Sequence, residues 1–249
     1  MNELAGKRAL VVGGSRGFGR GIAEALAGAG AVVHVVARHP EPLAELERGS
    51  EGRIRASAGD AADPVVPARL LDETRPDIVV LNAGASPHLA PIQDQTWDTF
   101  SINWNSDVRI VFHWLREILI KPLPSGSQVV VVSSGAALRG SPLSGGYAGS
   151  KATVRFMAQY AAEESSRAKL GIRVTSILPR LSPATELGRP AVAAYARRAG
   201  RSEEQYLAQI GPPLTPPLAG AALVRLLTDR QLDAHAAFTL DHGGLTPLD

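Results

Sequence analysis

Short runs of apolar, mostly β-branched residues recur along this chain, and longer segments with helical patterns separate them. The first six runs are almost entirely apolar, without the alternation that marks a strand with one face in water. Such runs are typical of parallel strands that helices cover on both faces. We therefore expect an α/β fold with a doubly wound, Rossmann-type sheet of seven mostly parallel strands and helices on both faces. The predicted strands are Ala9–Val12, Val32–Ala37, Ile54–Ala58, Ile78–Leu81, Val129–Val132, Ile172–Ile177 and Phe238–Leu240.

The spacing of apolar residues predicts three longer helices, Gly19–Ala29, Asp98–Ile120 and Ala148–Leu170. Residues 181–217 interrupt this alternation, because six prolines fall in the segment. Two short helical patterns lie between those prolines, Ala191–Arg198 and Ser202–Ile210. Long excursions from a compact domain are usually functional. We therefore expect residues 1–249 to form a single domain in which the 181–217 segment serves as a substrate lid.

The composition excludes several classes of protein and site. The 249 residues contain no cysteine, which excludes disulfides, iron–sulfur clusters and thiolate metal sites. The net charge of +2 and the mixed charge pattern give no sign of a nucleic-acid partner. No two of the six histidines have the spacing of a helical metal site, so we predict no metal. No apolar run approaches the ~20 residues that span a bilayer, so we expect a cytoplasmic protein without a membrane partner.

A glycine-rich turn follows the first predicted strand and leads into the first predicted helix. Its residues are Gly13, Gly14, Ser15, Arg16, Gly17, Phe18 and Gly19. Glycine permits the positive φ angles and close backbone approach that let main-chain N–H groups and a helix N-terminus hold a pyrophosphate. The spacing differs from the Gly-x-Gly-x-x-Gly pattern of many dinucleotide sites. A tight strand–helix turn without a ligand is the alternative interpretation.

The end of the second predicted strand indicates which dinucleotide would bind. An NAD site usually has a carboxylate there, which binds the 2′-hydroxyl of the ribose. This chain has Arg38 at that place and no acidic residue beside it. Arg38 and Arg16 of the glycine turn could both bind a 2′-phosphate, since a guanidinium makes paired, charge-assisted hydrogen bonds. We therefore predict NADP(H) in preference to NAD(H), although both arginines could also be ordinary solvated side chains.

A serine, a tyrosine and a lysine occur in an order that suits carbonyl chemistry. Ser133 and Ser134 end the fifth predicted strand, and ligands of open α/β sheets bind at such carboxyl ends. Tyr147 and Lys151 are four residues apart near the start of a long helix, and therefore one turn apart on one face. A phenol, with an ordinary pKa of about 10, is a weak base at neutral pH, but an adjacent ammonium favours the phenolate. Such a tyrosine can give a proton to a carbonyl oxygen or take one from an alcohol.

Taken in this order, the motifs resemble those of the short-chain dehydrogenase/reductase family, in its short single-domain form. The resemblance covers nearly the whole chain. Besides the glycine turn and the pair Tyr147 and Lys151, the matching positions are Ser134 as the catalytic serine, Asp60 after the third strand, Asn82-Ala83-Gly84 after the fourth, Asn103 in the long helix that follows, and the turn Asp241-His242-Gly243-Gly244.

The resemblance implies a role for each matching residue. Tyr147 is implied as general acid and base, and Lys151 as the residue that binds the nicotinamide ribose and favours the phenolate. Ser134 is implied to bind the substrate oxygen, and Asn103 to support a water relay towards Lys151. The implied cofactor-binding residues are Gly13, Ser15, Arg16, Gly17, Phe18, Gly19, Arg38, Asp60, Asn82, Ala83, Gly84, Tyr147, Lys151 and Pro179.

Three positions depart from the family pattern. Val12 stands where the family usually has Thr, and Arg180 follows Pro179 where it usually has Gly. The family's Thr at the fifth residue past that proline is Ala184 here, with Thr185 one position later. Arg180 could alter the cofactor geometry, bind an anionic group of the substrate or point into solvent.

The expected function is therefore an NADP(H)-dependent carbonyl reductase or alcohol dehydrogenase that acts on a small molecule. Two alternatives stay open: a 3-oxoacyl thioester reductase of lipid metabolism, and a non-catalytic NADP(H)-binding sensor or scaffold. The resemblance also implies a homodimer or homotetramer, in which the two long helices would pack against symmetry mates. Small residues that would allow such close packing are Ala148, Ala152, Ala158, Ala161 and Ala162.

Overall fold

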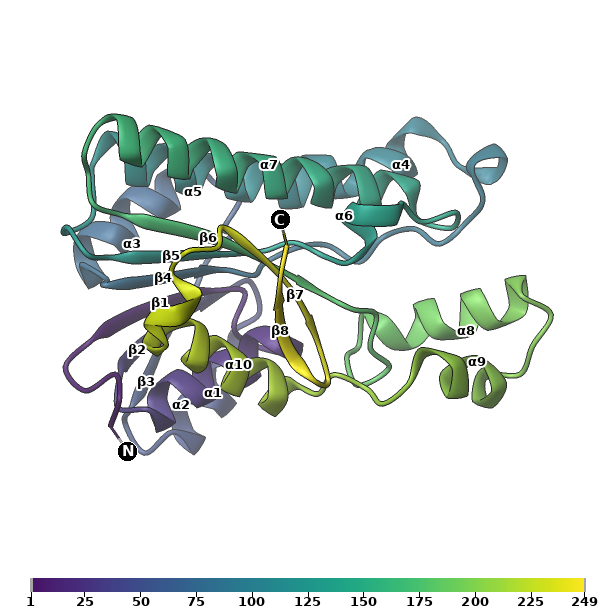
Figure 1. The fold of residues 1–249 in the computed structure, drawn as a ribbon, viewed down its shortest axis with the longest axis horizontal. Helices are drawn as coiled ribbons and strands as arrows, with labels where there is room; N and C mark the ends of the chain where they lie inside the picture. The colour runs from purple at the N-terminus through teal and green to yellow at the C-terminus, as the bar shows by residue number, and fades with distance from the viewer. Residues whose placement is uncertain (1, 249) are drawn as a thin grey trace.

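The computed structural model of the protein describes residues 2–248, which form three layers with one twisted sheet in the middle (Figure 1). The strand order is β3-β2-β1-β4-β5-β6-β7-β8. All neighbouring pairs are parallel except β7 and β8. From β1 to β3 each new strand is added on one side of β1. The chain then returns to the other side of β1, where β4 and the later strands are added in the opposite direction. In such a sheet the carboxyl ends of the strands at this switch point form a crevice.

The predicted fold class is confirmed, but the sheet has eight strands rather than seven. The missed strand is β8, which pairs antiparallel with β7 across a turn in which Gly244 has a φ of +106°. Its residues are partly exposed at the sheet edge, so they lack the continuous apolar run of the other strands. The strands are β1 (Arg8–Val12), β2 (Val32–Ala37), β3 (Ile54–Ala58), β4 (Ile78–Leu81), β5 (Gln128–Val132), β6 (Arg173–Pro179), β7 (Ala237–Asp241) and β8 (Gly244–Pro247).

Helices cover both faces of the sheet, and several begin at recognisable caps. Thr96 and Ser202 each form a capping box, and Thr215 caps a helix that opens with two prolines. The helices are α1 (Gly17–Gly28), α2 (Pro40–Gly49), α3 (Val65–Thr74), α4 (Trp97–Asn103), α5 (Arg109–Ile120), α6 (Ala136–Arg139), α7 (Gly145–Arg167), α8 (Gly188–Arg198), α9 (Glu203–Ile210) and α10 (Pro216–Thr228), with short η1 (Ile92–Asp94), η2 (Trp104–Val108) and η3 (Arg230–Leu232).

Two apolar cores lie on the two faces of the sheet. One packs α1, α2 and α10 against it, and the other packs α3, α5 and α7 (Figure 1). Because both faces are covered, the central strands are apolar at nearly every position. Trp114 of α5 lies at the centre of the second core; it is fully buried and donates from Nε1 to the carbonyl oxygen of Ala61 at 3.1 Å. No helix within residues 2–248 has the length and hydropathy needed to cross a membrane.

The predicted helix Asp98–Ile120 is not one regular α-helix. It begins as α4, widens into the π-helical turn η2 and continues as α5. A π turn holds one residue more than an α turn, which changes the direction of the side chains that follow it. The sequence pattern did not reveal this π turn. Apolar residues continue at helical spacing on both sides of it, so a single extra residue leaves the overall pattern nearly unchanged.

The alanines of the predicted Ala148–Leu170 helix pack within this chain. Ala148, Ala158 and Ala161 are buried in the structure of the single chain. Large apolar side chains on α5 and α7 are instead exposed, among them Phe112, Phe156 and Tyr160. The predicted homodimer or homotetramer stays a prediction.

The glycine-rich turn brings the ends of β1 and β4 into close contact. Gly13 has a φ of +83°, and a Cβ atom there would lie 2.5 Å from the Cα of Ala83. A Cβ atom at Gly19 would overlap the carbonyl oxygen of Gly13 and lie 2.5 Å from Nδ2 of Asn82. The Asn82 amide in turn donates to the carbonyl oxygen of Gly13 at 2.9 Å. These glycines are therefore required by packing, whatever the turn binds.

We expect Trp114→Phe to lower the free energy of unfolding by about 1–3 kcal/mol, because it leaves the buried carbonyl of Ala61 without a donor. Urea unfolding followed by circular dichroism measures this change. The same substitution at Trp97, whose side chain is 74% exposed, should change stability by less than about 0.5 kcal/mol. Equal losses in the two variants would contradict this account of the core.

We expect Gly19→Ala to destabilise the protein by at least about 1–3 kcal/mol, because the new methyl group meets backbone rather than open space. Gly28→Ala in the same helix is the matched control. A Cβ atom at Gly28 has no neighbour within 4 Å among the described residues, so this change should stabilise the helix by up to about 1 kcal/mol. Thermal unfolding of both variants measures the difference, which should disappear if the turn has room for a side chain.

Candidate active site

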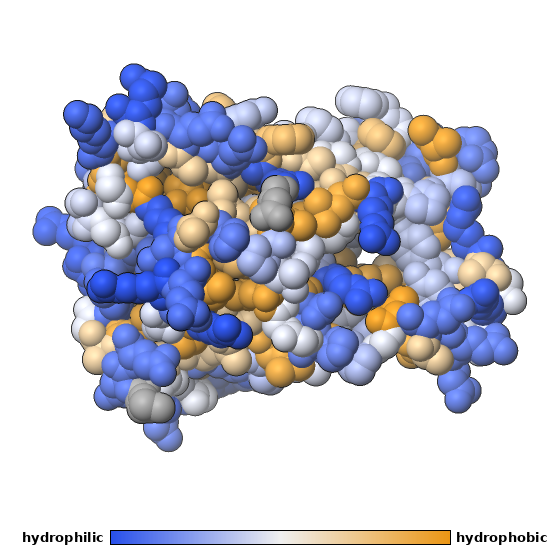
Figure 2. Space-filling view, in the orientation of Figure 1, coloured by the Kyte–Doolittle hydropathy of each residue, from blue (hydrophilic) through white to orange (hydrophobic). Residues whose placement is uncertain are grey.

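A cavity of about 960 Å³ lies at the carboxyl ends of the strands. Figure 2 shows the molecule hollowed here, between the part that contains α6 and the start of α7 and the part that contains α8 and α9. The 181–217 segment contributes Leu187, Ala191, Tyr195 and Tyr206 to the wall. Tyr195 and Tyr206 stack with ring centroids 6.4 Å apart, and the Tyr195 hydroxyl contacts that of Ser141. The cavity is therefore enclosed on one side by the sheet edge and on the other by this segment.

The N-terminus of α1 lies on this wall without a cap of its own. Its N-cap residue, Arg16, makes no side-chain cap hydrogen bond, and the first turn contains no acidic residue. Gly17 and Phe18 of that turn line the cavity. The first N–H groups of a helix are unpaired and carry a partial positive charge, so they attract an anion. This turn therefore fits the pyrophosphate of a dinucleotide.

Three of the predicted cofactor residues are charged and lie around this turn. Arg38 follows β2, Asp60 follows β3, and both are exposed on the cavity wall. Arg16 also lines the cavity, but its guanidinium forms an ion pair with Glu186 of the 181–217 segment, with Nη1 and Oε2 2.6 Å apart. Both side chains of this pair are more than half exposed, so water screens the attraction and the pair can open at little cost.

Ser133 and Ser134 have different environments, although both follow β5 directly. Ser133 is buried, and its hydroxyl donates to the carbonyl oxygen of Lys151 at 2.7 Å. Ser134 is partly exposed, and its Oγ accepts a hydrogen bond from the backbone N–H of Ala136 at 3.2 Å. Ser133 thus links β5 to α7. The Ser134 hydroxyl, in contrast, donates no hydrogen bond to another of the described residues.

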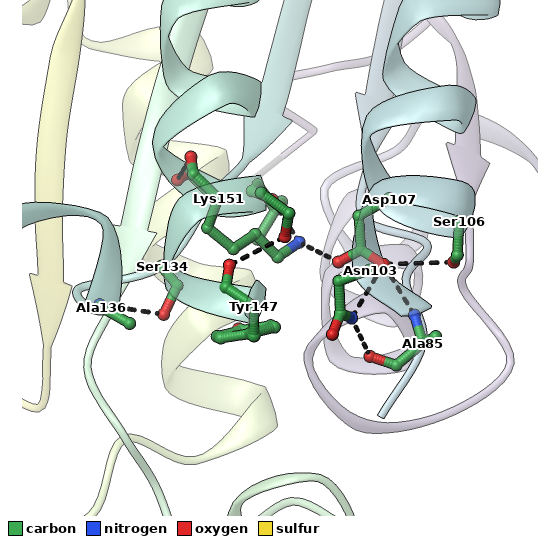
Figure 3. A network of polar contacts seen from close by, with 11 residues as sticks. Ala85, Asn103, Ser106, Asp107, Ser134, Ala136, Tyr147 and Lys151 are labelled. Carbon is green, nitrogen blue, oxygen red and sulfur yellow. Dashed lines mark hydrogen bonds and ion pairs between the residues drawn. The ribbon is translucent and has the colours of Figure 1, made fainter. Parts of the chain in front are cut away.

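Tyr147 and Lys151 both line the cavity from the first turns of α7, beside Ser134 (Figure 3). Nζ of Lys151 lies 5.7 Å from the centroid of the Tyr147 ring. The same ammonium lies 3.3 Å from the carbonyl oxygen of Val132. The lysine is almost fully buried, whereas the tyrosine is partly exposed to the cavity. A cation is therefore held next to a phenol that a small molecule can reach.

Lys151 is paired with a carboxylate, that of Asp107 in η2, with Nζ and Oδ2 3.0 Å apart (Figure 3). Asp107 is 1% exposed. Burial acts to lower the pKa of the Lys151 ammonium, but the charges of Asp107 and Tyr147 outweigh it and the pKa is raised above its ordinary value. Lys151 is therefore a stable cation in the folded protein throughout the neutral range.

Most of the predicted site residues come together, but two do not line the cavity. Gly19 lies beneath the turn, against Gly13. Asn103 is buried, and its amide donates to the carbonyl oxygen of Ala85 at 2.7 Å and to Oδ1 of Asp107 at 3.2 Å. The structure therefore brings Asp107, rather than Asn103, into contact with Lys151. All other predicted residues line the cavity, namely Gly13, Ser15, Arg16, Gly17, Phe18, Arg38, Asp60, Asn82, Ala83, Gly84, Ser134, Tyr147, Lys151 and Pro179.

Arg180 lines the cavity and is exposed. Its Nη1 atom lies 3.8 Å from Oδ2 of Asp241, at the end of β7. The structure thus places Arg180 in a partly solvated ion pair with Asp241. Thr185, the residue shifted by one position from the family pattern, accepts a hydrogen bond from the N–H of Gly188 at 3.0 Å and so helps begin α8.

Sequence reasoning missed Asp107, Glu186 and the contact between Ser141 and Tyr195. Each joins segments far apart in the chain, and no spacing rule connects them. A weak signal for Asp107 exists, since an acidic residue on the apolar face of a helical pattern needs a partner when it is buried. Glu186 carries no comparable signal, because acidic residues are common in surface segments.

The family model of the short chain dehydrogenases matches residues 7–195. A short chain dehydrogenase/reductase of Macrophomina phaseolina (strain MS6) is 34% identical over 151 residues, which cover 55% of this chain and 86% of that protein. The L-rhamnose 1-dehydrogenase (NAD(P)(+)) of Sphingomonas sp. (strain SKA58) is 30% identical over 258 residues, which cover 98% of each chain.

A solved structure shows the same fold over almost the whole chain. It is a short chain dehydrogenase from Burkholderia cenocepacia J2315 in complex with NADP, with a TM-score of 0.80 and 28% sequence identity. The similarity covers 97% of this chain and 98% of that one. The resemblance seen in the sequence motifs is thereby confirmed, and the chain belongs to the short chain dehydrogenase family of oxidoreductases.

Proposed function

We propose that this protein is an NADP(H)-dependent oxidoreductase that transfers a hydride between the nicotinamide and a carbonyl or secondary alcohol substrate, with Tyr147 as general acid and base. The observation that carries this proposal is the placement of Tyr147 and Lys151. They lie one helical turn apart on α7 and line one cavity with Ser134. The uncapped N-terminus of α1 lies on the wall of that same cavity.

The cofactor site runs along the carboxyl edge of the sheet. The glycine turn and the first N–H groups of α1 bind the pyrophosphate, Asp60 faces the adenosine end, and Lys151 binds the ribose at the other end. Asn82, Ala83, Gly84 and Pro179 complete the wall between them. When bound, the nicotinamide supplies or accepts the hydride, and the protein positions and polarises the substrate.

Tyr147 transfers the proton that accompanies the hydride. Its hydroxyl gives a proton to the substrate oxygen during reduction and takes one from the alcohol during oxidation. The adjacent Lys151 ammonium favours the phenolate that the second direction requires. Ser134 donates a hydrogen bond to the same substrate oxygen, because its Oγ already accepts from Ala136 and its hydrogen remains to be donated.

The preference for NADP(H) rests on Arg38 and Arg16. Arg38 has no ion-pair partner in residues 2–248, so its guanidinium can bind a 2′-phosphate directly. Arg16 must first release Glu186, which costs little for so exposed a pair. The NADP complex of the similar Burkholderia protein supports this choice, whereas the name of the Sphingomonas relative covers both cofactors.

The substrate part of the cavity is lined in part by the 181–217 segment. Leu138 of α6 provides one apolar wall, and Leu187 and the stacked Tyr195 and Tyr206 provide the other, so the 181–217 segment itself forms the lid. A 3-oxoacyl thioester is the alternative substrate, and the two classes are separated by assay rather than by the lining.

We expect Tyr147→Phe to reduce turnover of a ketone or alcohol substrate by at least about 100-fold, because general acid–base catalysis contributes about that much. NADPH binding, measured by quenching of tryptophan fluorescence, should change little. The matched control is Tyr160→Phe on the same helix, where the side chain is exposed and turnover should stay at the original level.

Turnover should be measured with a panel of simple ketones, secondary alcohols and 3-oxoacyl thioesters. Turnover of thioesters alone would favour the lipid reductase. Tight NADPH binding without turnover of any member of the panel would favour the sensor, as would full activity of Tyr147→Phe in the pathway that the protein serves.

We expect Arg38→Gln to weaken NADPH binding by roughly 10- to 100-fold, because a charge-assisted hydrogen bond contributes about 1.5–3 kcal/mol. NADH binding should change little, since NADH lacks the 2′-phosphate. Isothermal titration with both cofactors measures the ratio. Arg48→Gln on α2 removes an exposed arginine outside the cavity lining and serves as the charge control. An equal loss for NADH and NADPH would contradict the proposed preference.

A further inference from the structure

Asp107 is a buried carboxylate in the candidate site that the proposed reaction does not use. Its Oδ1 accepts hydrogen bonds from the N–H of Ala85 at 2.9 Å, from Nδ2 of Asn103 at 3.2 Å and from the hydroxyl of Ser106 at 3.1 Å. Its Oδ2 receives no hydrogen bond from the described residues. The Lys151 ammonium lies 3.0 Å from Oδ2, and its positive charge balances the negative charge of the carboxylate. One oxygen thus fixes the carboxylate, and the other is left for the lysine (Figure 3).

The helices are built to allow this contact. Asp107 belongs to the π turn η2, whose extra residue changes the direction of the side chains in the long helix. On the facing helix, a Cβ atom at Gly146 would overlap the carbonyl oxygen of Phe100, and one at Gly149 would lie 3.5 Å from the Trp104 ring. Gly146 therefore lets α7 approach α4 closely, whereas the contact at Gly149 is one that an alanine could also make. The lysine one turn further along α7 then reaches the carboxylate.

Few charges act on the Lys151 ammonium besides that of Asp107. Tyr147 faces it from its own helix, and burial opposes its charge. β5 presents the carbonyl of Val132 and the hydroxyl of Ser133, and neither ionises in this range. Asn103, on the η2 side, is neutral as well. Three further arginines line the same cavity, and all three are exposed: Arg109, Arg139 and Arg180.

We propose that Asp107 is a positioning residue of this site, whose carboxylate holds the Lys151 ammonium beside Tyr147 and keeps it protonated. The inference rests on the proposed function, in which Tyr147 and Lys151 act together. An unpaired ammonium in so buried a place would tend to lose its proton. A lysine without charge would no longer favour the phenolate. Asp107 therefore determines the charge of the group that activates the tyrosine.

The experiment compares the unfolding of the wild type and Asp107→Asn by urea between about pH 7 and pH 10. Without the carboxylate, the pair of Lys151 and Tyr147 loses its first proton at lower pH. The native wild type then binds more protons than the native variant, so its stability advantage must shrink as the pH rises. The ratio of the two unfolding constants should fall by up to about tenfold per pH unit in that window.

The control is Asp98→Asn, which removes an exposed carboxylate on α4. Its unfolding constant should keep a fixed ratio to that of the wild type at every pH. The pH profile of turnover is the second readout. In Asp107→Asn the limb that reports the tyrosine–lysine pair should move to lower pH, because a neutral amide no longer compensates the buried ammonium.

A stability difference that stays constant over the range would overturn the proposal, because Asp107 would then serve to support Ala85. If Asp107→Asn does not fold, the double variant with Lys151→Met decides. A folded double variant supports the pairing, since it removes both charges, whereas an unfolded one overturns it.

The unfolding measurements need neither substrate nor cofactor, so this inference and the proposed function can fail separately. A shrinking stability difference together with full turnover by Tyr147→Phe would refute the proposed function alone. A constant difference together with an inactive Tyr147→Phe would refute the role of Asp107 alone.

Discussion

A parallel sheet must be covered on both faces, and this requirement organises the whole molecule. Parallel strands need helical crossovers, which place helices on the two faces and bring every carboxyl end to one edge. Residues from six strand ends therefore meet at one cavity: Gly13, Arg38, Asp60, Asn82, Ser134 and Pro179. The site is thus a consequence of strand direction, and the residues that follow each strand supply its chemistry.

The buried ion pair of Asp107 and Lys151 carries a large desolvation cost in the folded protein. Taking two charges out of water is expensive, and losing one partner of a buried pair typically costs about 3–5 kcal/mol. Here the cost is reduced because Oδ1 of Asp107 accepts hydrogen bonds from Ala85, Asn103 and Ser106. The exposed pair of Arg16 and Glu186 is the opposite case, since it links the glycine turn to the 181–217 segment at little cost.

Sequence patterns predicted the fold class, and most of the site residues that they selected line the cavity, because those features are local. Continuous apolar runs mark buried strands, and a four-residue spacing places Tyr147 and Lys151 on one helix face. The patterns failed at β8, which is short and partly exposed at the edge, and at the π turn, which a periodic pattern does not reveal. The family resemblance implied a water relay from Asn103 towards Lys151, which stays a prediction, and it gave no sign of the carboxylate of Asp107 that contacts the lysine.

The amino-acid order alone thus specifies strands, turns and the spacing of Ser134, Tyr147 and Lys151, since each depends on neighbours a few residues away. Which charges meet is a different matter. Asp107 reaches Lys151 because Gly146 of α7 lets two helices approach and because a π turn redirects one of them. Arg16 reaches Glu186 because the 181–217 segment folds back over the cavity. Contacts of this kind join residues that are distant in the chain. They depend on how the helices and the sheet pack, which the local sequence pattern does not specify.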